Sequence, residues 1–239
     1  YMRKYAYIVA ILFSFFACSS TAKREVSPEA QVSIIRFDNE FHSYLKNPKF
    51  ETENLLKAKY PALLSAFGLT TVGLTLESGG DDFYPTLREY FGHPMLTQIY
   101  EESIKMFDDA SPYEEQLTQA NSLIAEHIAN KRLPKLSMHV SGFKENVIVL
   151  EDMISISSDK YLGSNYAGYK DFSFQPHQLQ QMQPKMIVRD YLKAWLISDV
   201  RKKDNSPENL LSVMVEEGKT LYILSVLLPQ YSVYDLFGD

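Results

Sequence analysis

The chain has 239 residues, of which 45% are hydrophobic and 23% charged, and its formal net charge is −6. These proportions are typical of a packed globular protein and not of a disordered one. Because affinity for phosphate backbones comes from clustered Lys and Arg, the acidic balance argues against a nucleic-acid-binding function.

Residues 1–17 are expected to be a secretory signal peptide. Arg3 and Lys4 supply a positive start, residues 5–16 are apolar except for Ser14, and small residues follow. This apolar run is shorter than the ~20 residues that a membrane-spanning helix needs, so export and cleavage are predicted. Cleavage would move the net charge from −6 to −8, because the segment carries two cations and no acid.

Cys18 is the only cysteine in the sequence and stands where the cut would fall. An internal disulfide is therefore excluded. The segment ending at Cys18 resembles the lipobox of bacterial lipoproteins, with Phe15 where leucine is usual. The resemblance implies cleavage after Ala17, a diacylglycerol on the thiol and an acyl group on the new amine. Two or three such chains anchor a protein stably, at ~0.8 kcal/mol per buried CH₂. An ordinary signal peptide, or an uncleaved anchor with a free thiol, is the alternative.

Residues 18–30 are expected to form a flexible, lipidated tether, and residues 31–239 a single globular domain. The domain should begin with a short strand over residues 32–37, which is rich in β-branched side chains. Asp38 should then cap a helix that runs to about Leu45.

The next helical segment is predicted over residues 50–67, where apolar residues recur at helical spacing. Pro61 should break or kink it, and Gly68 should end it. Residues 68–80, rich in Gly and Thr, are expected to form a loop or an extended segment.

Three further helices are predicted before residue 132. Asp81 or Asp82 should cap a helix over residues 83–91, and a helix starting at Pro94 should reach Phe107. The third has the clearest start signal, a capping box formed by Ser111 and Glu114, and should extend to Lys131.

Strand periodicity follows. Residues 136–142 alternate between apolar and polar side chains, residues 146–150 form a continuous apolar run, and a turn between them predicts a hairpin. Residues 153–156 are a third extended candidate. Two helices should end the chain, one over residues 184–203 and one from Ser206 through Leu228.

A long aromatic loop lies between these strands and helices, and it is the candidate binding site. Its rings could bind a partner or pack into the core, and the sequence does not separate these uses. The candidate residues are Tyr161, Tyr166, Tyr169, Phe172 and Phe174.

Sequence patterns for catalysis are missing. The His-Glu-x-x-His pattern of zinc peptidases is absent, because no two of the five histidines are four residues apart. Neither a Gly-x-Ser-x-Gly segment nor a phosphate-binding loop occurs. No catalytic residue, metal or cofactor is therefore predicted. The histidines are His42, His93, His127, His139 and His177.

Several segments together resemble the GldB family of gliding motility-associated lipoproteins. The resemblance covers most of the chain. Because members of that family are longer at the C-terminus, a truncation near Asp239 is expected. The segments are Arg36-Phe37-Asp38, Tyr60-Pro61, Tyr161-Leu162-Gly163 with Tyr166 and Tyr169, Met182 to Trp195, Glu216 to Tyr222 and Leu227-Leu228-Pro229.

This family is similar in pattern to zinc peptidases whose His-Glu-x-x-His helix precedes a second helix with a Glu-Gly ligand motif. By that similarity residues 184–203 stand for the first helix, which lacks histidine here, and Glu216 and Glu217 form a residual acidic motif on the second. The resemblance implies an α+β, predominantly helical fold with helices around a small sheet, in a degenerate zincin-like architecture without the reaction.

The expected function is non-catalytic binding or scaffolding by a lipid-anchored protein of the bacterial cell envelope. Its partners would be the membrane, through the lipid, and envelope proteins such as the gliding or secretion machinery. Ser19 in place of Asp after the cysteine favours the periplasmic face of the outer membrane. The alternative is a zinc-dependent envelope peptidase or hydrolase with unrecognised ligands.

Overall fold

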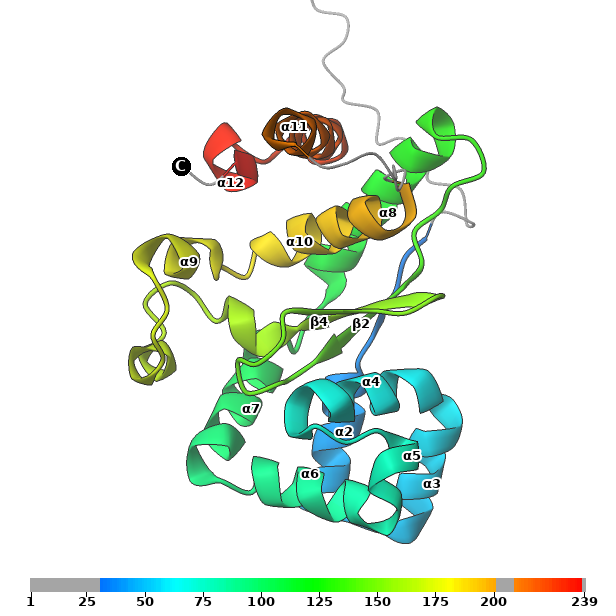
Figure 1. The fold of residues 1–239 in the computed structure, drawn as a ribbon, viewed down its shortest axis with the longest axis vertical. Helices are drawn as coiled ribbons and strands as arrows, with labels where there is room; N and C mark the ends of the chain where they lie inside the picture. The colour runs from blue at the N-terminus through cyan, green and yellow to red at the C-terminus, as the bar shows by residue number, and fades with distance from the viewer. Residues whose placement is uncertain (1–30, 201–208, 238–239) are drawn as a thin grey trace, which may run out of the picture.

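A four-stranded mixed sheet lies in the middle of the fold, with helices on both of its faces (Figure 1). The computed structural model describes residues 31–200 and 209–237. The strand order is β1 (Ile34–Ile35), β2 (Lys135–His139), β4 (Met153–Ser157) and β3 (Val147–Val149). The predicted α+β, predominantly helical class is confirmed.

The pairing of the strands corrects the predicted hairpin. β2 pairs in parallel with both β1 and β4, and β3 pairs antiparallel with β4 alone. The hairpin is therefore β3–β4, and residues 136–142 do not pair with residues 146–150. The parallel register sets Leu136 beside Ile154 and Met138 beside Ile156, which aligns buried apolar side chains along the two central strands.

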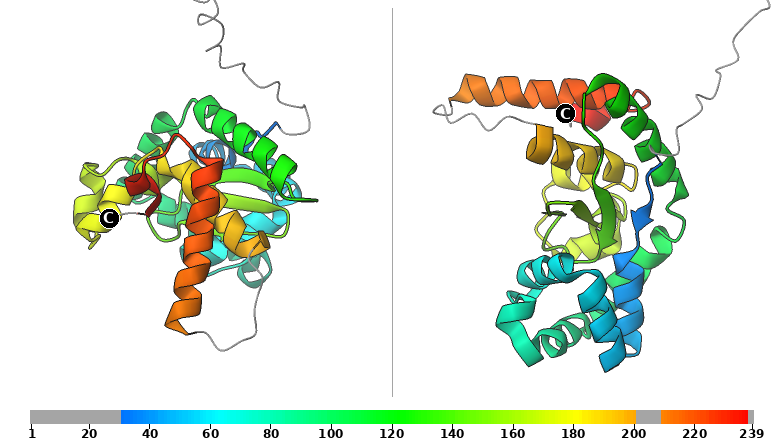
Figure 2. Two further views of the ribbon diagram at one scale, coloured as in Figure 1. Left: turned by 90° about the horizontal axis from the view of Figure 1, so that it is seen from above. Right: turned by 90° about the vertical axis from the view of Figure 1, so that its right-hand side faces the viewer.

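Helices form two layers and an outer element (Figures 1 and 2). In one layer α2 packs on β2 and α4 on β3; on the other side α10 packs on β3 and β4 and lies beside α8. α11 crosses the outer side of α8 and α10, next to α12. The helices are α2 (Phe37–Lys46), α3 (Phe50–Lys59), α4 (Pro61–Val72), α5 (Leu76–Gly79), α6 (Phe83–Phe91), α7 (Pro94–Met106), α8 (Ser111–His127), α9 (Pro176–Gln181), α10 (Met186–Trp195), α11 (Leu210–Leu227) and α12 (Val233–Phe237).

A cluster of aromatic rings forms the core of the α2–α7 layer. The ring centroid of Phe41 lies 5.6 Å from that of Phe37, 5.3 Å from Phe67 and 5.9 Å from Phe91. The Phe41–Phe67 and Phe41–Phe91 pairs are edge-to-face and the Phe37–Phe41 pair is stacked, and such pairs contribute beyond the area they bury. Part of the aromatic content of the chain therefore stabilises the fold.

Helix α4 continues through Gly68, which corrects the predicted helix end and the predicted loop. The helix ends at Val72, followed by Gly73 in the left-handed conformation with φ 78°. A Cβ on Gly68 would lie 2.3 Å from the ring of Phe83. Gly68 is thus required by the close approach of α6 and does not terminate a helix.

Two helices start within two residues of the predicted position, but the predicted capping interactions are not the ones observed. Ser111 is the first residue of α8 and not its cap, and its hydroxyl donates to Asp109 at 2.6 Å. Glu114 instead accepts a hydrogen bond from the backbone N–H of Ile34, at 2.8 Å, and so ties β1 to α8. Asp38 lies inside the first turn of α2 and is not its N-cap; it pairs with Arg36 at 3.0 Å and accepts a hydrogen bond from the N–H of Asn39 at 2.9 Å.

Other boundaries differ by a few residues. Helix α6 has its predicted bounds, although Asp82 makes no capping bond. Helix α8 ends at His127 and not at Lys131, and α10 begins at Met186 and is followed by a π-helical turn over Leu196–Val200. The predicted start at Ser206 lies outside the described residues. Among the described helices, none is both long and apolar enough to cross a membrane.

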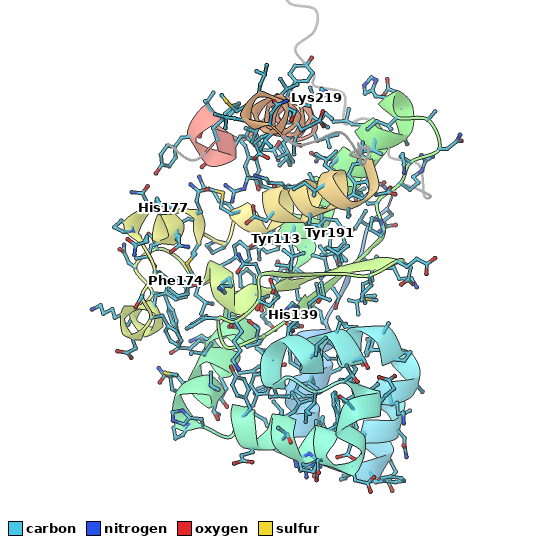
Figure 3. All side chains as sticks on the ribbon, in the orientation of Figure 1. Tyr113, His139, Phe174, His177, Tyr191 and Lys219 are labelled. Carbon is cyan, nitrogen blue, oxygen red and sulfur yellow. The ribbon has the colours of Figure 1, made fainter. Side chains whose placement is uncertain are left out.

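His139 is buried between the sheet and α4 (Figure 3). Its Nδ1 lies 2.9 Å from the Ser155 hydroxyl, its ring packs edge-on against Phe67, and burial lowers its pKa to about 3. The imidazole is therefore neutral in the folded protein, whereas in the unfolded chain it binds a proton below about pH 6.5.

His139 should make the stability of the protein depend on pH. Because the unfolded state binds the extra proton between about pH 6.5 and 3, the stabilisation is complete above pH 6.5 and is lost as the pH falls. Relative to His139→Gln, the wild-type protein should lose roughly 2–3 kcal/mol of unfolding free energy between pH 7 and 4.5. Urea titrations at both pH values measure the difference. His93→Gln, at an exposed position, is the control and should show no such change.

Candidate functional site

A cavity of about 320 Å³ opens between α9, α10 and α12. Figure 3 shows His177 on α9, at the side of the molecule where α10 begins. The lining is mostly polar and includes cations and one acid. The lining residues are His177, Gln181, Arg189, Asp190, Lys193, Leu236 and Phe237.

Helix α10 supplies the charged side of this cavity. Its apolar positions, among them Ile187, Tyr191 and Trp195, are buried in the core. Arg189, Asp190 and Lys193 occupy the remaining face, because residues spaced by three or four share a side of a helix. Burial of the apolar face thus orients the polar face toward α9, α11 and α12.

Arg189 is the centre of a buried hydrogen-bond network. Its Nε donates to Asp190 at 2.7 Å, and its Nη2 lies 2.6 Å from the same carboxylate. Its Nη1 donates to the Gln181 amide oxygen and, at 2.7 Å, to the backbone carbonyl of Asp235. Four of its five N–H groups therefore have partners within the chain, and Arg189 joins α9, α10 and α12.

Asp190 is also held by Tyr161. The Tyr161 hydroxyl donates to Asp190 Oδ2 at 2.8 Å. Burial, with the nearby Asp190 carboxylate, raises the pKa of Tyr161 well above its usual value, so the phenol keeps its proton. Both oxygens of Asp190 are thus occupied, and neither is positioned as a free base.

Lys193 forms an ion pair with Glu217, with 2.5 Å between Nζ and Oε1. This pair joins α10 to α11 and accounts for half of the predicted acidic motif. Glu216, the other half, pairs with Lys219 of its own helix at 2.6 Å. The structure therefore places Glu216 and Glu217 in separate ion pairs.

Asp235 lies on α12, next to the cavity-lining residues Leu236 and Phe237. It pairs with Lys185 at 2.5 Å and accepts hydrogen bonds from the N–H of Ser232. Burial alone would raise the pKa of Asp235, but the bonds from Lys185 and Ser232 outweigh it, so the pKa lies below its usual value. Asp235 is thus ionised and paired.

The predicted aromatic loop is a packed cluster around Phe143. The ring of Phe143 lies 5.0 Å from that of Tyr169, 4.8 Å from Phe172 and 6.1 Å from Phe174. Tyr169 is buried, and its hydroxyl donates to the carbonyl of Asp159 at 2.8 Å.

Tyr161 of the same loop is buried against α10, whereas Tyr166, Phe172 and Phe174 are half-buried. Tyr166 also donates a hydrogen bond to Glu102. The loop therefore stabilises the fold through all five residues, and three of them are only partly buried.

The histidines do not converge. His139 is buried on the sheet, and His42 stacks on Tyr100 with ring centroids 5.0 Å apart. His93, His127 and His177 are exposed at separate places. Residues 31–200 and 209–237 hold no cluster of three or more His, Cys, Asp or Glu side chains that could bind a metal ion.

Sequence reasoning missed Arg189, Asp190 and Lys193 as a group. The signal that could have found them is the spacing Arg-Asp-x-x-Lys, which puts three charged side chains on one face of an otherwise apolar helix. The lipidation residue Cys18 lies outside the described residues.

The comparisons with known proteins identify one family. A family model described as gliding motility protein GldB matches residues 19–238. Searches of curated proteins and of solved structures found no match. The zincin-like architecture thus stays a prediction.

Arg189→Ala should destabilise the protein strongly. The change leaves Asp190 without its buried cation and the Asp235 carbonyl without its donor, and it should lower the unfolding free energy by about 2–4 kcal/mol. Lys135→Ala is the matched control, since its ion pair with Asp152 is exposed, and no measurable loss is expected. Chemical denaturation measures both; equal effects would show that the Arg189 network does not stabilise the fold.

Proposed function

The chain belongs to the family of the gliding motility protein GldB, and on that premise we propose that it is a lipid-anchored protein of the bacterial cell envelope that acts by binding or scaffolding. It is a gliding motility-associated protein by family. Beyond the family, we propose that Cys18 carries the lipid anchor, that the protein catalyses no reaction, and that it lies at the periplasmic face of the outer membrane.

The charged face of α10 is the observation that carries the non-catalytic part. In the zinc peptidases that the family resembles in pattern, this helix would present two histidines and a glutamate. Here the spacing i, i+1, i+4 is occupied by Arg189, Asp190 and Lys193, of which two are cations that repel a metal ion. The ammonium of Lys193 pairs with Glu217, the residue that would be the remaining ligand. The Lys193 ammonium therefore supplies the positive charge next to the Glu217 carboxylate that a zinc ion would otherwise supply.

The partly exposed residues of the aromatic loop support the binding part of the proposal. Tyr166, Phe172 and Phe174 are half-buried, and a rigid cluster around Phe143 holds them in place. Preorganised aromatic side chains lose little conformational entropy on binding. We therefore place the contact with another envelope protein, or with cell-wall material, at this loop.

The anchoring part rests on Cys18, the single cysteine, at the end of a signal-like segment. The family match begins at residue 19, directly after it. This agrees with a mature protein that starts at Cys18.

Cys18→Ala should remove the protein from the membrane fraction. The wild-type protein should carry the mass of its acyl chains and resist extraction by high salt and carbonate, because two or three chains anchor it. The variant should appear in the soluble exported fraction. Ser19→Ala, the neighbouring change, should leave both the mass shift and the fractionation unchanged. A wild-type protein without lipid mass would contradict the anchor.

A zinc-dependent hydrolase is the second candidate, and one observation favours it: His177 and Asp190 line the same cavity. Two such ligands, without a third, do not match the three protein ligands of catalytic zinc sites. The two candidates make opposite predictions for bound metal.

The purified protein should hold far less than one equivalent of zinc, and Glu217→Ala should not change the amount. Metal content by mass spectrometry, after dialysis against buffer containing zinc, measures this. The same measurement on His177→Ala and Lys193→Ala tests two side chains that line the cavity, and neither change should alter the zinc content. One equivalent of zinc that Glu217→Ala or His177→Ala removes would overturn the non-catalytic proposal.

A further inference from the structure

Helix α11 has two apolar faces, and within residues 31–200 and 209–237 only one of them packs on other helices. Thr220, Leu224 and Leu227 are buried, where the helix rests on α8 and α10. On the opposite side, Leu211, Val215 and Tyr222 follow at spacings of four and seven residues, which aligns them along the outer side of the helix. We call this stripe, together with the adjoining Met214, the outer face of α11.

The outer face is strongly exposed. Leu211 is 70% exposed, Met214 62%, Val215 47% and Tyr222 70%. The charged residues of α11 lie off the stripe, in the Glu216–Lys219 and Lys193–Glu217 pairs. Neighbouring exposed apolar side chains that form one patch mark an interaction site on a globular domain.

The first turns of α11 are apolar on the other side as well. Leu210 is 77% and Val213 41% exposed, because this part of the helix projects beyond the helices on which its second half rests (Figure 2). A partner with a flat or grooved protein surface covers one side of a helix. A lipid surface instead surrounds a projecting apolar end, and such helices lie with leucine and aromatic side chains at the headgroup boundary.

The described part of the chain begins beside α8, on the side of the molecule that carries α11. β1 starts next to α8, where Val32 donates to Thr118 at 3.0 Å and Ile34 to Glu114, and α8 packs against α11. The 13 Cα–Cα steps from Cys18 to Gln31 span at most about 45 Å when fully extended. A lipid at Cys18 is thus attached nearer to the α11 end of the molecule than to the α3–α6 end (Figure 1).

We propose that the outer face of α11 docks on the lipid bilayer to which Cys18 anchors the chain. The proposal rests on the lipid anchor of the proposed function and adds an orientation: α11 lies along the membrane surface, and the α2–α7 layer faces away from it. The Tyr222 hydroxyl would remain at the level of the headgroups, where aromatic side chains with a polar end are favoured. Because the face carries no Lys or Arg, the contact is apolar and insensitive to salt.

Single thiol labels test the orientation in the full, lipidated protein. Lipid occupies the thiol of Cys18, the only cysteine, so an introduced cysteine is the sole site for a polarity-sensitive fluorophore. Leu211→Cys and Tyr222→Cys report on the outer face. Leu55→Cys on α3 is the matched control, since Leu55 is 69% exposed and helix α3 lies at the opposite end of the molecule from α11 (Figure 1).

The labelled proteins are reconstituted in vesicles of phosphatidylethanolamine and phosphatidylglycerol that contain a spin-labelled lipid quencher. Quenching of the labels at residues 211 and 222 should exceed quenching at residue 55 by roughly fivefold, as for side chains at the acyl boundary. Raising the salt to about 0.5 M should not change the ratio.

Two results would overturn the proposal. One is equal quenching at residues 55, 211 and 222. The other is a label at residue 211 that is shielded from a water-soluble quencher but not reached by the lipid quencher, which would assign the face to a second copy or to another protein. Failure of the anchor itself is distinguishable, because Cys18 would then be labelled in the wild-type chain.

Discussion

The carboxylate of Asp159 joins the ends of the two central strands, and much of the molecule depends on that bond. β2 and β4 are parallel, so their carboxyl ends meet at one edge of the sheet. There Asp159 accepts hydrogen bonds from the N–H of Phe143 at 2.7 Å, the N–H of Ser141 at 3.3 Å and the Ser157 hydroxyl. The residue is fully buried, and the desolvation that raises its pKa is only partly offset by these donors.

The loop held by Asp159 connects the sheet to the aromatic loop. Phe143 has φ 65°, a conformation that is unfavourable for a residue with a Cβ and is here held by the bond to its N–H. In this position its ring is the centre of the cluster that includes Tyr169 and Phe172. Tyr161, two residues beyond Asp159, reaches Asp190 on α10. The polar edge of the sheet thus positions both the aromatic loop and the charged face of α10.

Local patterns predicted the elements well and their partners poorly. Helical spacing with Pro or Asp nearby located α6 and α7 almost to the residue, because these signals act within a few residues of the chain. Strand pairing is decided elsewhere: the alternation of Leu136 to His139 fits an antiparallel hairpin as well as the observed parallel pair, and the choice follows from burial of both central strands. Glu114 shows the same limit, since its local pattern is that of a capping box but its partner is the N–H of Ile34.

In the candidate site, too, local sequence patterns indicate single residues but not the partners that those residues contact in the fold. Glu217 was identified from sequence, but its partner, Lys193, is 24 residues away and becomes visible only when α10 and α11 are packed. Arg189 donates to groups on three elements, which no local spacing indicates.

The free energy available for interactions with other molecules is distributed unevenly over the described surface. On α10 the charged groups already satisfy one another, so a polar ligand would have to displace bonds such as the one between Arg189 and Asp190, at a cost near that of the bonds it forms. On α11 the side chains of Leu211 and Tyr222 are each 70% exposed, so binding there displaces mainly water and breaks no ion pair. Removing apolar surface from water is favourable at roughly 25 cal/mol per Å². Association through the apolar outer face is therefore favoured over ligand binding in the charged cavity, which is the order that the proposed binding function requires.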